Sequence, residues 1–188
     1  SNDVWSPGTE LHERGLLPVN NAQYGRAVYM SRDGNYLAVG AYISDEAGGD
    51  QGCVFVYVWD GDQWVKQAKF VASVPEDSAY YGHSVALTSD GSKLAVGAPQ
   101  EDISSGDNKG AAYIYKRVDT VWSLEEKIQR SSLSTTAHFG NELSFSGDGT
   151  YLVIGAMLQD TNSQDRSGAA YVYKWNGTAW DTGAAELI

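Results

Sequence analysis

The fold is decided by residues 81–98, which read YGHSVALTSDGSKLAVGA. Apolar and polar side chains alternate on both sides of the Asp90-Gly91 pair, and this period of two predicts β-strands rather than helices. Asp-Gly also supplies the positive φ that tight hairpin turns require. The stretch therefore predicts two antiparallel strands joined by a short turn.

The same pattern occurs three times in the chain. Residues 24–41 and 139–156 repeat it, at offsets of 57 and 58 residues. Each copy starts with an aromatic residue followed by Gly, has Asp-Gly in the middle and ends with Gly-Ala. Later landmarks keep the same phase; they are the Gly-to-Tyr segments 52–57, 110–115 and 168–173, followed by Trp64, Trp122 and Trp180. So many landmarks at one period define a repeat.

Each copy is expected to form four antiparallel strands. In the second copy they lie near 82–88, 93–98, 110–116 and 121–128, with a long polar loop over 99–109. A sheet of this size cannot bury both of its faces alone, and stacking such sheets radially gives the blades of a β-propeller. The Gly-Ala pairs suit inner positions, where small residues let neighbouring backbones converge. A single β-sandwich is the competing fold, but its strands would occupy non-equivalent places.

The expected organisation is an all-β array of β-propeller blades, with three four-stranded antiparallel meanders plus one extra N-terminal strand. Trp5 and Leu11 repeat the spacing of the fourth strand of each copy, which is the reason for expecting that extra strand. The expected segments are 1–23 for the extra strand and its connection, and 24–80, 81–138 and 139–188 for the blades. Closed propellers need about four or more blades. The propeller is therefore expected to be partial or completed by oligomerisation: either the stretch belongs to a longer array, or two chains combine into a six-bladed ring.

The repeated residues resemble a known family. Its pattern is represented here by Phe139-Gly140, by 96–99 (Val-Gly-Ala-Pro) and by 110–115 (Gly-Ala-Ala-Tyr-Ile-Tyr). These residues resemble the FG-GAP repeat, the blade unit of the integrin alpha-subunit propeller and of related bacterial surface proteins, and the resemblance covers residues 24–188. It implies propeller blades, usually seven in a ring, in a secreted or cell-surface protein that serves adhesion or ligand recognition rather than catalysis.

One family feature is missing from this chain. Many blades of the family carry an Asp-rich calcium loop between their first two strands. Here the matching turns each contain a single carboxylate, from Asp33, Asp90 or Asp148. Calcium takes about six to eight oxygen ligands, so we expect these residues to form turns. No cofactor and no metal site is expected, although calcium binding remains possible without the usual loop.

Composition excludes several kinds of partner. The 188 residues carry a formal net charge of −11 and no cluster of Lys or Arg, so we expect no nucleic-acid partner. No apolar run approaches the about 20 residues that span a bilayer, and the given chain has no signal peptide. We therefore expect no membrane insertion. Cys53 is the single cysteine, which rules out an intrachain disulfide and a multi-cysteine metal site.

Two sets of residues are candidates for ligand contact at the propeller loops. Acidic residues recur in the loops between the second and third strands of each copy: Asp45, Asp50, Asp102, Asp107, Asp160 and Asp165. They could bind a cation or a basic partner, but Asp also closes loops through Asx-turns, and recurrence in every copy favours that structural role. Trp59 and Trp175 precede the last turn of their copies, where the middle copy has Arg117. Aromatic faces bind sugars and cations.

The resemblance implies a non-catalytic binding or adhesion module with a protein or carbohydrate ligand. We expect its contact surface at loops 42–51, 99–109 and 157–167 and at the neighbouring loops 71–80 and 129–138. Its expected assembly partners are further copies in a homo-oligomer or neighbouring blades of a longer chain. The alternative is a structural or oligomerisation scaffold with no ligand of its own. A propeller hydrolase or lyase would need an acid–base cluster near the ring axis, and the sequence shows none.

Overall fold

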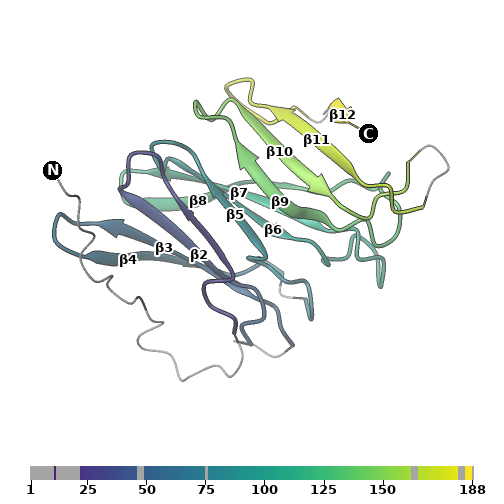
Figure 1. The fold of residues 1–188 in the computed structure, drawn as a ribbon, viewed down its shortest axis with the longest axis horizontal. Helices are drawn as coiled ribbons and strands as arrows, with labels where there is room; N and C mark the ends of the chain where they lie inside the picture. Colours follow the sequence, from purple (N-terminus) through teal and green to yellow (C-terminus); the bar gives the residue numbers. More distant parts are fainter. Residues whose placement is uncertain are drawn as a thin grey trace, which may run out of the picture.

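A computed structural model describes residues 11, 22–45, 49–74, 76–161, 165–181 and 185–187 of the chain. These residues form twelve β-strands arranged in three four-stranded sheets (Figure 1). They contain no helix that is long and apolar enough to cross a lipid bilayer. The all-β expectation is therefore confirmed.

Each sheet is an antiparallel meander of four strands that are consecutive in the chain. The first sheet consists of β1 (Ala27–Met30), β2 (Tyr36–Ala41), β3 (Cys53–Trp59) and β4 (Trp64–Phe70). The second consists of β5 (Ser84–Leu87), β6 (Lys93–Ala98), β7 (Ala111–Val118) and β8 (Val121–Ile128). The third consists of β9 (Phe139–Phe145), β10 (Tyr151–Ala156), β11 (Ala169–Lys174) and β12 (Ala185–Leu187).

The register repeats from sheet to sheet. Val39 pairs with Phe55, Val96 with Tyr113, and Ile154 with Tyr171. These pairs occupy the same places in the three sequence copies, so the repeat in sequence is a repeat in pairing. A slip of one residue would move every side chain to the opposite face of its sheet, so the pattern of buried positions fixes the register.

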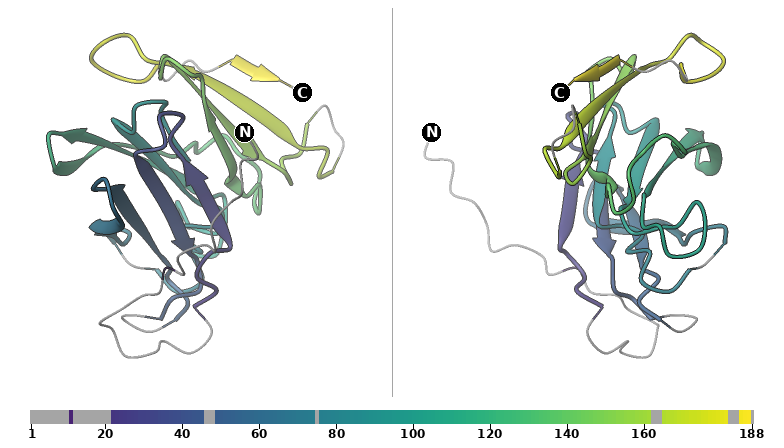
Figure 2. Two further views of the ribbon diagram at one scale, coloured as in Figure 1. Left: turned by 60° about the vertical axis from the view of Figure 1, so that its left-hand side comes forward. Right: turned by 90° about the vertical axis from the view of Figure 1, so that its right-hand side faces the viewer.

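The three sheets follow one another around an arc, with the second between the first and third (Figures 1 and 2). The first strand of each sheet packs on the first two strands of the sheet before it: β5 lies against β1 and β2, and β9 lies against β5 and β6. This is the stacking of propeller blades, so the structure is a partial propeller of three blades.

Two apolar clusters fill the spaces between the blades. Between the first and second, Val54 and Val56 pack with Leu87, Leu94 and Tyr115 among others. The cluster between the second and third contains Ile114, Ile128, Leu143, Phe145, Leu152, Ile154, Tyr171 and Trp180. Burying one such side chain is worth about 1.5–3 kcal/mol. The second blade contributes one face to each cluster, which is why residues 94–98 are all buried.

Glycines make the close contact between blades. A Cβ on Gly97 would lie 1.9 Å from the carbonyl oxygen of Gly140, and one on Gly40 would lie 2.1 Å from that of Gly82. Gly82 and Gly140 have φ of +88° and +90°, which L residues with a side chain rarely adopt. The expected close approach is therefore confirmed at these two junctions, and it explains the aromatic-Gly pair: its Gly turns a carbonyl toward the preceding blade.

The repeated tryptophans also join blades. The Trp122 indole N–H donates to Gln67 Oε1 over 2.7 Å, and the Trp180 indole N–H donates to Glu125 Oε2 over 3.3 Å. Gln67 and Glu125 lie on the fourth strand of the preceding blade, β4 and β8. The constant position of the tryptophans in the sequence repeat thus reflects their packing between blades.

The extra N-terminal strand is expected within residues 1–23, which lie outside the described residues except for Leu11, Ala22 and Gln23. Leu11 packs with Phe55 against the outer face of the first sheet. The extra strand and the division of the chain into 1–23, 24–80, 81–138 and 139–188 stay predictions.

Candidate functional site

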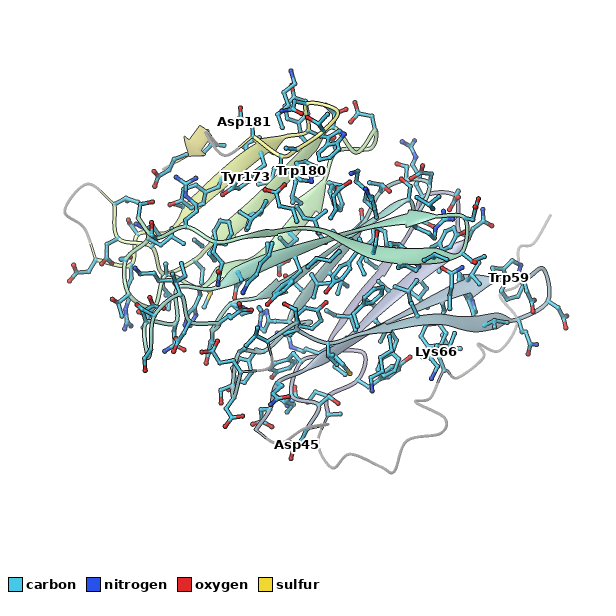
Figure 3. All side chains as sticks on the ribbon, turned by 180° about the vertical axis from the view of Figure 1, so that it is seen from behind. Asp45, Trp59, Lys66, Tyr173, Trp180 and Asp181 are labelled. Atoms are coloured by element: carbon cyan, nitrogen blue, oxygen red, sulfur yellow. The ribbon has the colours of Figure 1, made fainter. Side chains whose placement is uncertain are left out.

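The blades have two different ends. The turn between the first and second strands lies beside the turn between the third and fourth, because Trp59 N–H donates to Asn35 O over 2.9 Å and Trp175 N–H donates to Thr150 O over 2.8 Å. We call this the turn end. The long loops between the second and third strands lie at the opposite end, the loop end, where Asp45 is seen far from Trp59 (Figure 3).

Three equivalent Asp residues close the turns between first and second strands. Asp90 accepts hydrogen bonds from the Thr88 hydroxyl at 2.8 Å and from Ser92 N–H at 3.0 Å. Asp148 accepts them from the Ser146 hydroxyl at 2.6 Å and Thr150 N–H at 3.0 Å. Asp33 does the same in the first blade. The single carboxylates are therefore used to hold the turns, as expected.

These hydrogen bonds keep the carboxylates ionised. The Ser146 hydroxyl and the Thr150 N–H lower the pKa of Asp148 to about 2. At Asp90, burial raises the pKa, but the hydrogen bonds from Ser92 and Thr88 outweigh it and the net shift is downward. Both groups are charged acceptors at neutral pH, because hydrogen bonds to the ionised form favour it.

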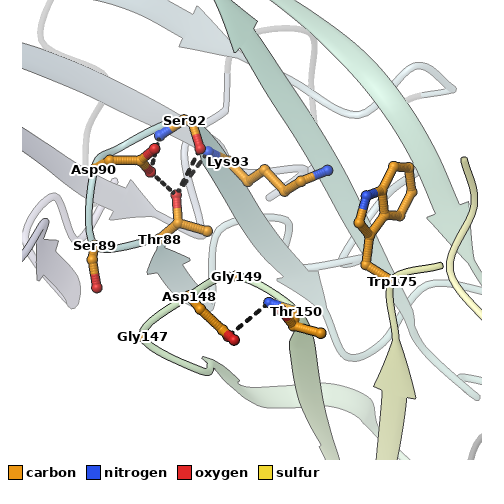
Figure 4. A pocket seen from close by; sticks show the side chains of 10 residues that line it. All are labelled: Thr88, Ser89, Asp90, Ser92, Lys93, Gly147, Asp148, Gly149, Thr150 and Trp175. Atoms are coloured by element: carbon orange, nitrogen blue, oxygen red, sulfur yellow. Dashed lines mark hydrogen bonds between the residues drawn. The ribbon is translucent and has the colours of Figure 1, made fainter. Parts of the chain in front are cut away.

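The turns of the second and third blades enclose a pocket of about 450 Å³ at the turn end (Figure 4). We call it the turn pocket. Its walls come from both blades, and Thr88 is itself buried. The lining residues are Thr88, Ser89, Asp90, Ser92, Lys93, Gly147, Asp148, Gly149, Thr150 and Trp175.

Lys93 and Trp175 line the turn pocket together. The Lys93 ammonium lies 3.9 Å from the centre of the Trp175 ring and forms an ion pair with Glu125. Glu125 also accepts the indole N–H of Trp180, whose ring centre is 5.5 Å from that of Trp175. The ammonium is held by a carboxylate and an aromatic face at once, a favourable cation–π arrangement that fixes the position of both side chains.

A second hollow of about 320 Å³ lies beside the turn pocket, where the first strands of all three blades converge. Ser89 and Gly147 line both hollows. The remaining lining residues of the second hollow are Tyr29, Met30, Arg32, Leu87, Phe145 and Ser146. The turn end therefore presents two adjoining hollows that share part of their lining.

The acidic loop candidates lie at the loop end, away from the turn pocket. Asp102 accepts hydrogen bonds from the N–H groups of Gly106 and Asn108, and Asp160 accepts the N–H of Arg166 at 2.7 Å. Asp107 likewise accepts hydrogen bonds within its loop, from Ile103 N–H at 2.9 Å and from both the N–H and the hydroxyl of Ser104. These three carboxylates hold the conformation of their own loops.

The other acidic candidates, Asp45, Asp50 and Asp165, are exposed. No three His, Cys, Asp or Glu side chains come together as a possible metal site within the described parts of the chain. The six acidic loop residues stay predicted contact residues.

Of the two aromatic candidates, the structure brings only Trp175 into the turn pocket. Trp59 occupies the same place in the first blade, where it is exposed and stacks edge-on against Trp64 at 5.5 Å. Sequence reasoning missed Lys93. Its signal was available, because Lys93 stands where the other copies have Tyr36 and Tyr151.

The comparisons with known proteins agree with the fold. The family model described as FG-GAP repeat matches residues 64–115 and 122–173. The chain belongs to the FG-GAP repeat family. Each FG-GAP match runs from the fourth strand of one sheet through the first three strands of the next, so one sequence repeat contains one complete blade junction. No curated protein matches the chain.

Two solved structures are similar in fold. Sqt1 of Saccharomyces cerevisiae aligns with a TM-score of 0.51 and 12% identity, over 90% of this chain and 36% of Sqt1. The β-propeller domain of Cps50 (Swd1) of Myceliophteria thermophila aligns with a TM-score of 0.51 and 14% identity, over 89% of this chain and 44% of that domain. The FG-GAP chain thus spans less than half of either structure, and the similarity shows the propeller fold alone.

Proposed function

We propose that this FG-GAP chain is a non-catalytic recognition module that binds a carbohydrate in the turn pocket. The observation that carries the proposal is the convergence of an indole ring, an ammonium, two ionised carboxylates and several hydroxyls in one pocket of about 450 Å³. Pockets for small ligands measure about 300–1,000 Å³ and combine aromatic walls with a few placed polar groups.

The chemistry of the lining suits a ligand rich in hydroxyl groups. Asp90 and Asp148 carry lowered pKa values, so they accept hydrogen bonds from hydroxyls at neutral pH. Lys93 can donate to a ring or hydroxyl oxygen, and the half-buried indole of Trp175 offers an apolar surface for the C–H groups of a sugar. Because the charge of Lys93 is already paired with Glu125, the two Asp carboxylates leave the pocket acidic. A neutral or cationic sugar fits it better than an anionic one.

The setting of such a module supports the same proposal. FG-GAP repeats are typical of extracellular and cell-surface proteins, so we propose that this chain is part of a secreted or cell-surface protein and serves adhesion. A propeller of this family is typically non-catalytic, and the groups of the turn pocket supply binding rather than a paired acid and base.

A glycan array followed by titration calorimetry tests the proposal, with Trp175→Ala as the pocket variant. Removing an aromatic contact from a sugar site should weaken binding by about tenfold or more. Trp59→Ala is the matched control, because Trp59 has the same place in the first blade and lies outside the turn pocket. We expect the control to bind as the wild type does. Silence of the folded wild-type chain on the array, or unchanged binding by Trp175→Ala, would favour the alternative of a scaffold without a ligand of its own.

A further inference from the structure

The first and third blades each have one face that packs against no other blade of this chain. Parts of these two faces are equivalent to the two sides of an internal blade junction. At both internal junctions, an apolar pair on the first strand of a blade is buried against the preceding blade. In the second blade this pair is Val85 and Leu87, which are 7% and 2% exposed. The equivalent residues of the first blade are Val28 and Met30, and they are 62% and 51% exposed. The front of the first blade thus carries a complete but uncovered contact strand, β1.

The back of the third blade is uncovered in the same way. Leu187 pairs with Ala170 as Ile128 pairs with Ala112, yet Leu187 is 58% exposed and Ile128 only 6%. Val153 and Tyr151 on β10 are exposed as well. These side chains lie on the face of the third blade that is turned away from the second, equivalent to the face of the second blade that packs on the third, and no described residue covers them.

The glycines show that the two faces match in shape. At the internal junctions a Cβ on Gly40 or Gly97 would strike the carbonyl of the next aromatic-Gly pair. Gly155 is the third member of this set, but the atoms nearest to its added Cβ belong to Glu142 of its own blade, at 3.7 Å and beyond. Gly25, the glycine of the first aromatic-Gly pair, has nothing within 4 Å of its added Cβ. The third blade leaves space beside Gly155, and the first blade exposes, at Gly25, the backbone that fills the equivalent space at the internal junctions.

The charges at these two faces are complementary. In the junction between the second and third blades, the Ser84 hydroxyl donates to Gly140 O over 2.7 Å. Glu142 stands in the place of Ser84, and Arg26 follows Gly25 as Asn141 follows Gly140. Arg26 and Glu142 are both exposed. A blade like the first, docked on the third, would therefore bring Arg26 beside Glu142.

We propose that a second copy of this chain docks head to tail, with β1 of the second copy on β9 and β10 of the first. The contact repeats the β1 part of the junction already present twice in the chain, and two copies joined twice in this way would form a ring of six blades. It uses the inner half of the first blade, whose β1 side chains are exposed. The outer half, around Phe55 and Leu11, is a separate buried cluster. The proposal does not depend on the turn pocket.

Sedimentation equilibrium of the 188-residue chain, from low to high micromolar concentration, tests the docking. We expect particles of twice the 20.3 kDa mass of one chain. Gly155→Ala should weaken association by about a hundredfold or more, because overpacking at a close contact is costly. The matched control is Gly147→Ala, whose added Cβ lies 3.6 Å from Ser89 Oγ at the turn end. It should associate as the wild type does.

A charge swap tests the orientation independently of the glycine. Glu142→Arg and Arg26→Glu should each weaken association by about tenfold, because each places like charges together. The double variant should restore it. A wild-type chain that stays monomeric at every concentration, a Gly155→Ala chain that associates normally, or a double variant that is not restored would each overturn the proposal. Far-UV circular dichroism of every variant checks that it remains folded.

Discussion

Gly97→Ala should open the junction between the second and third blades. The added Cβ would lie 1.9 Å from Gly140 O, 2.3 Å from Ser84 Oγ and 2.9 Å from Gly140 C. Carbon and oxygen atoms of non-bonded groups approach to no less than about 3 Å, so the two backbones must separate by about 1 Å. The methyl group also displaces the Ser84 hydroxyl from its hydrogen bond to Gly140 O.

The cost can be estimated from these displacements. Overpacking at a close contact costs about 1–3 kcal/mol, and a lost buried hydrogen bond costs about 1 kcal/mol more. A gap of about 1 Å also removes up to half of the dispersion energy across it, and Leu143 and Phe145 lie in the cluster that would lose contact. We expect Gly97→Ala to lower the free energy of unfolding by about 3 kcal/mol or more, from a total of about 5–15 kcal/mol for a typical domain.

Gly155→Ala is the matched control for this measurement. Gly155 has the same place in the sequence repeat, but its added Cβ meets no atom closer than 3.7 Å. The change should leave stability within about 0.5 kcal/mol or raise it slightly, because Ala loses less backbone entropy than Gly on folding.

The assay is urea unfolding of both variants, followed by tryptophan fluorescence, on samples that sediment as single chains. In a thermal melt the difference should appear as a decrease of about 6–12 °C in the Tm of Gly97→Ala. Equal midpoints for the two variants would refute the reasoning, because equivalent positions of the repeat would then respond alike in stability despite their different surroundings.

Three further changes should affect stability. Glu101→Ala removes a buried carboxylate that accepts the Tyr113 hydroxyl at 2.7 Å and pairs with Lys127; denaturant unfolding should show a loss of about 2–4 kcal/mol, and a loss below about 0.5 kcal/mol would argue against a role for this ion pair in folding. Trp180→Ala should cost about 3–5 kcal/mol in the same assay because the side chain is buried between blades, and a value like that of a surface substitution would contradict its assigned packing role. Asp148→Ala should destabilise the chain at pH 7, and urea midpoints measured from pH 7 to pH 2 should show the difference from wild type shrinking. The pKa of Asp148 is lowered to about 2 from 3.8, so its contribution is complete above about pH 4 and is lost as the pH falls through about 2; a difference as large at pH 2 as at pH 7 would rule out this linkage.

Much of the fold could be predicted because its signals are local. The short apolar run at 94–98 indicates a buried strand, and Asp90-Gly91 indicates the turn before it. The strand and the turn depend only on residues close to each other in the sequence, so they can be predicted without knowing which parts of the protein pack against them. The strands expected near 93–98 and 121–128 are found at Lys93–Ala98 and Val121–Ile128.

The candidate site could be predicted only in part. Trp175 was identifiable because its position is Trp in two copies and Arg117 in the middle one, and it does line the turn pocket. Lys93 was not identified, because its meaning depends on Glu125 in the same sheet and on Trp175 in the next. Glu125 is 32 residues from Lys93 and is brought near it by the pairing of strands within the sheet. Trp175 is 82 residues away and is brought near it by the packing of one blade on the next, which no local pattern encodes.

The sequence by itself determined three four-stranded repeats, their turns and the small residues at their inner strands, because backbone preferences and side-chain alternation act over a few residues. The tertiary structure decided which equivalent positions of the repeat have the same neighbours, and therefore the same effect on stability when they are substituted. Gly97 and Gly155 occupy the same position of the repeat, yet a Cβ on Gly97 would lie 1.9 Å from a carbonyl oxygen of the next blade, whereas one on Gly155 would meet no atom closer than 3.7 Å. The physical reason is that a blade face gains its energy from what is packed against it, and that neighbour is set by the arrangement of blades in space.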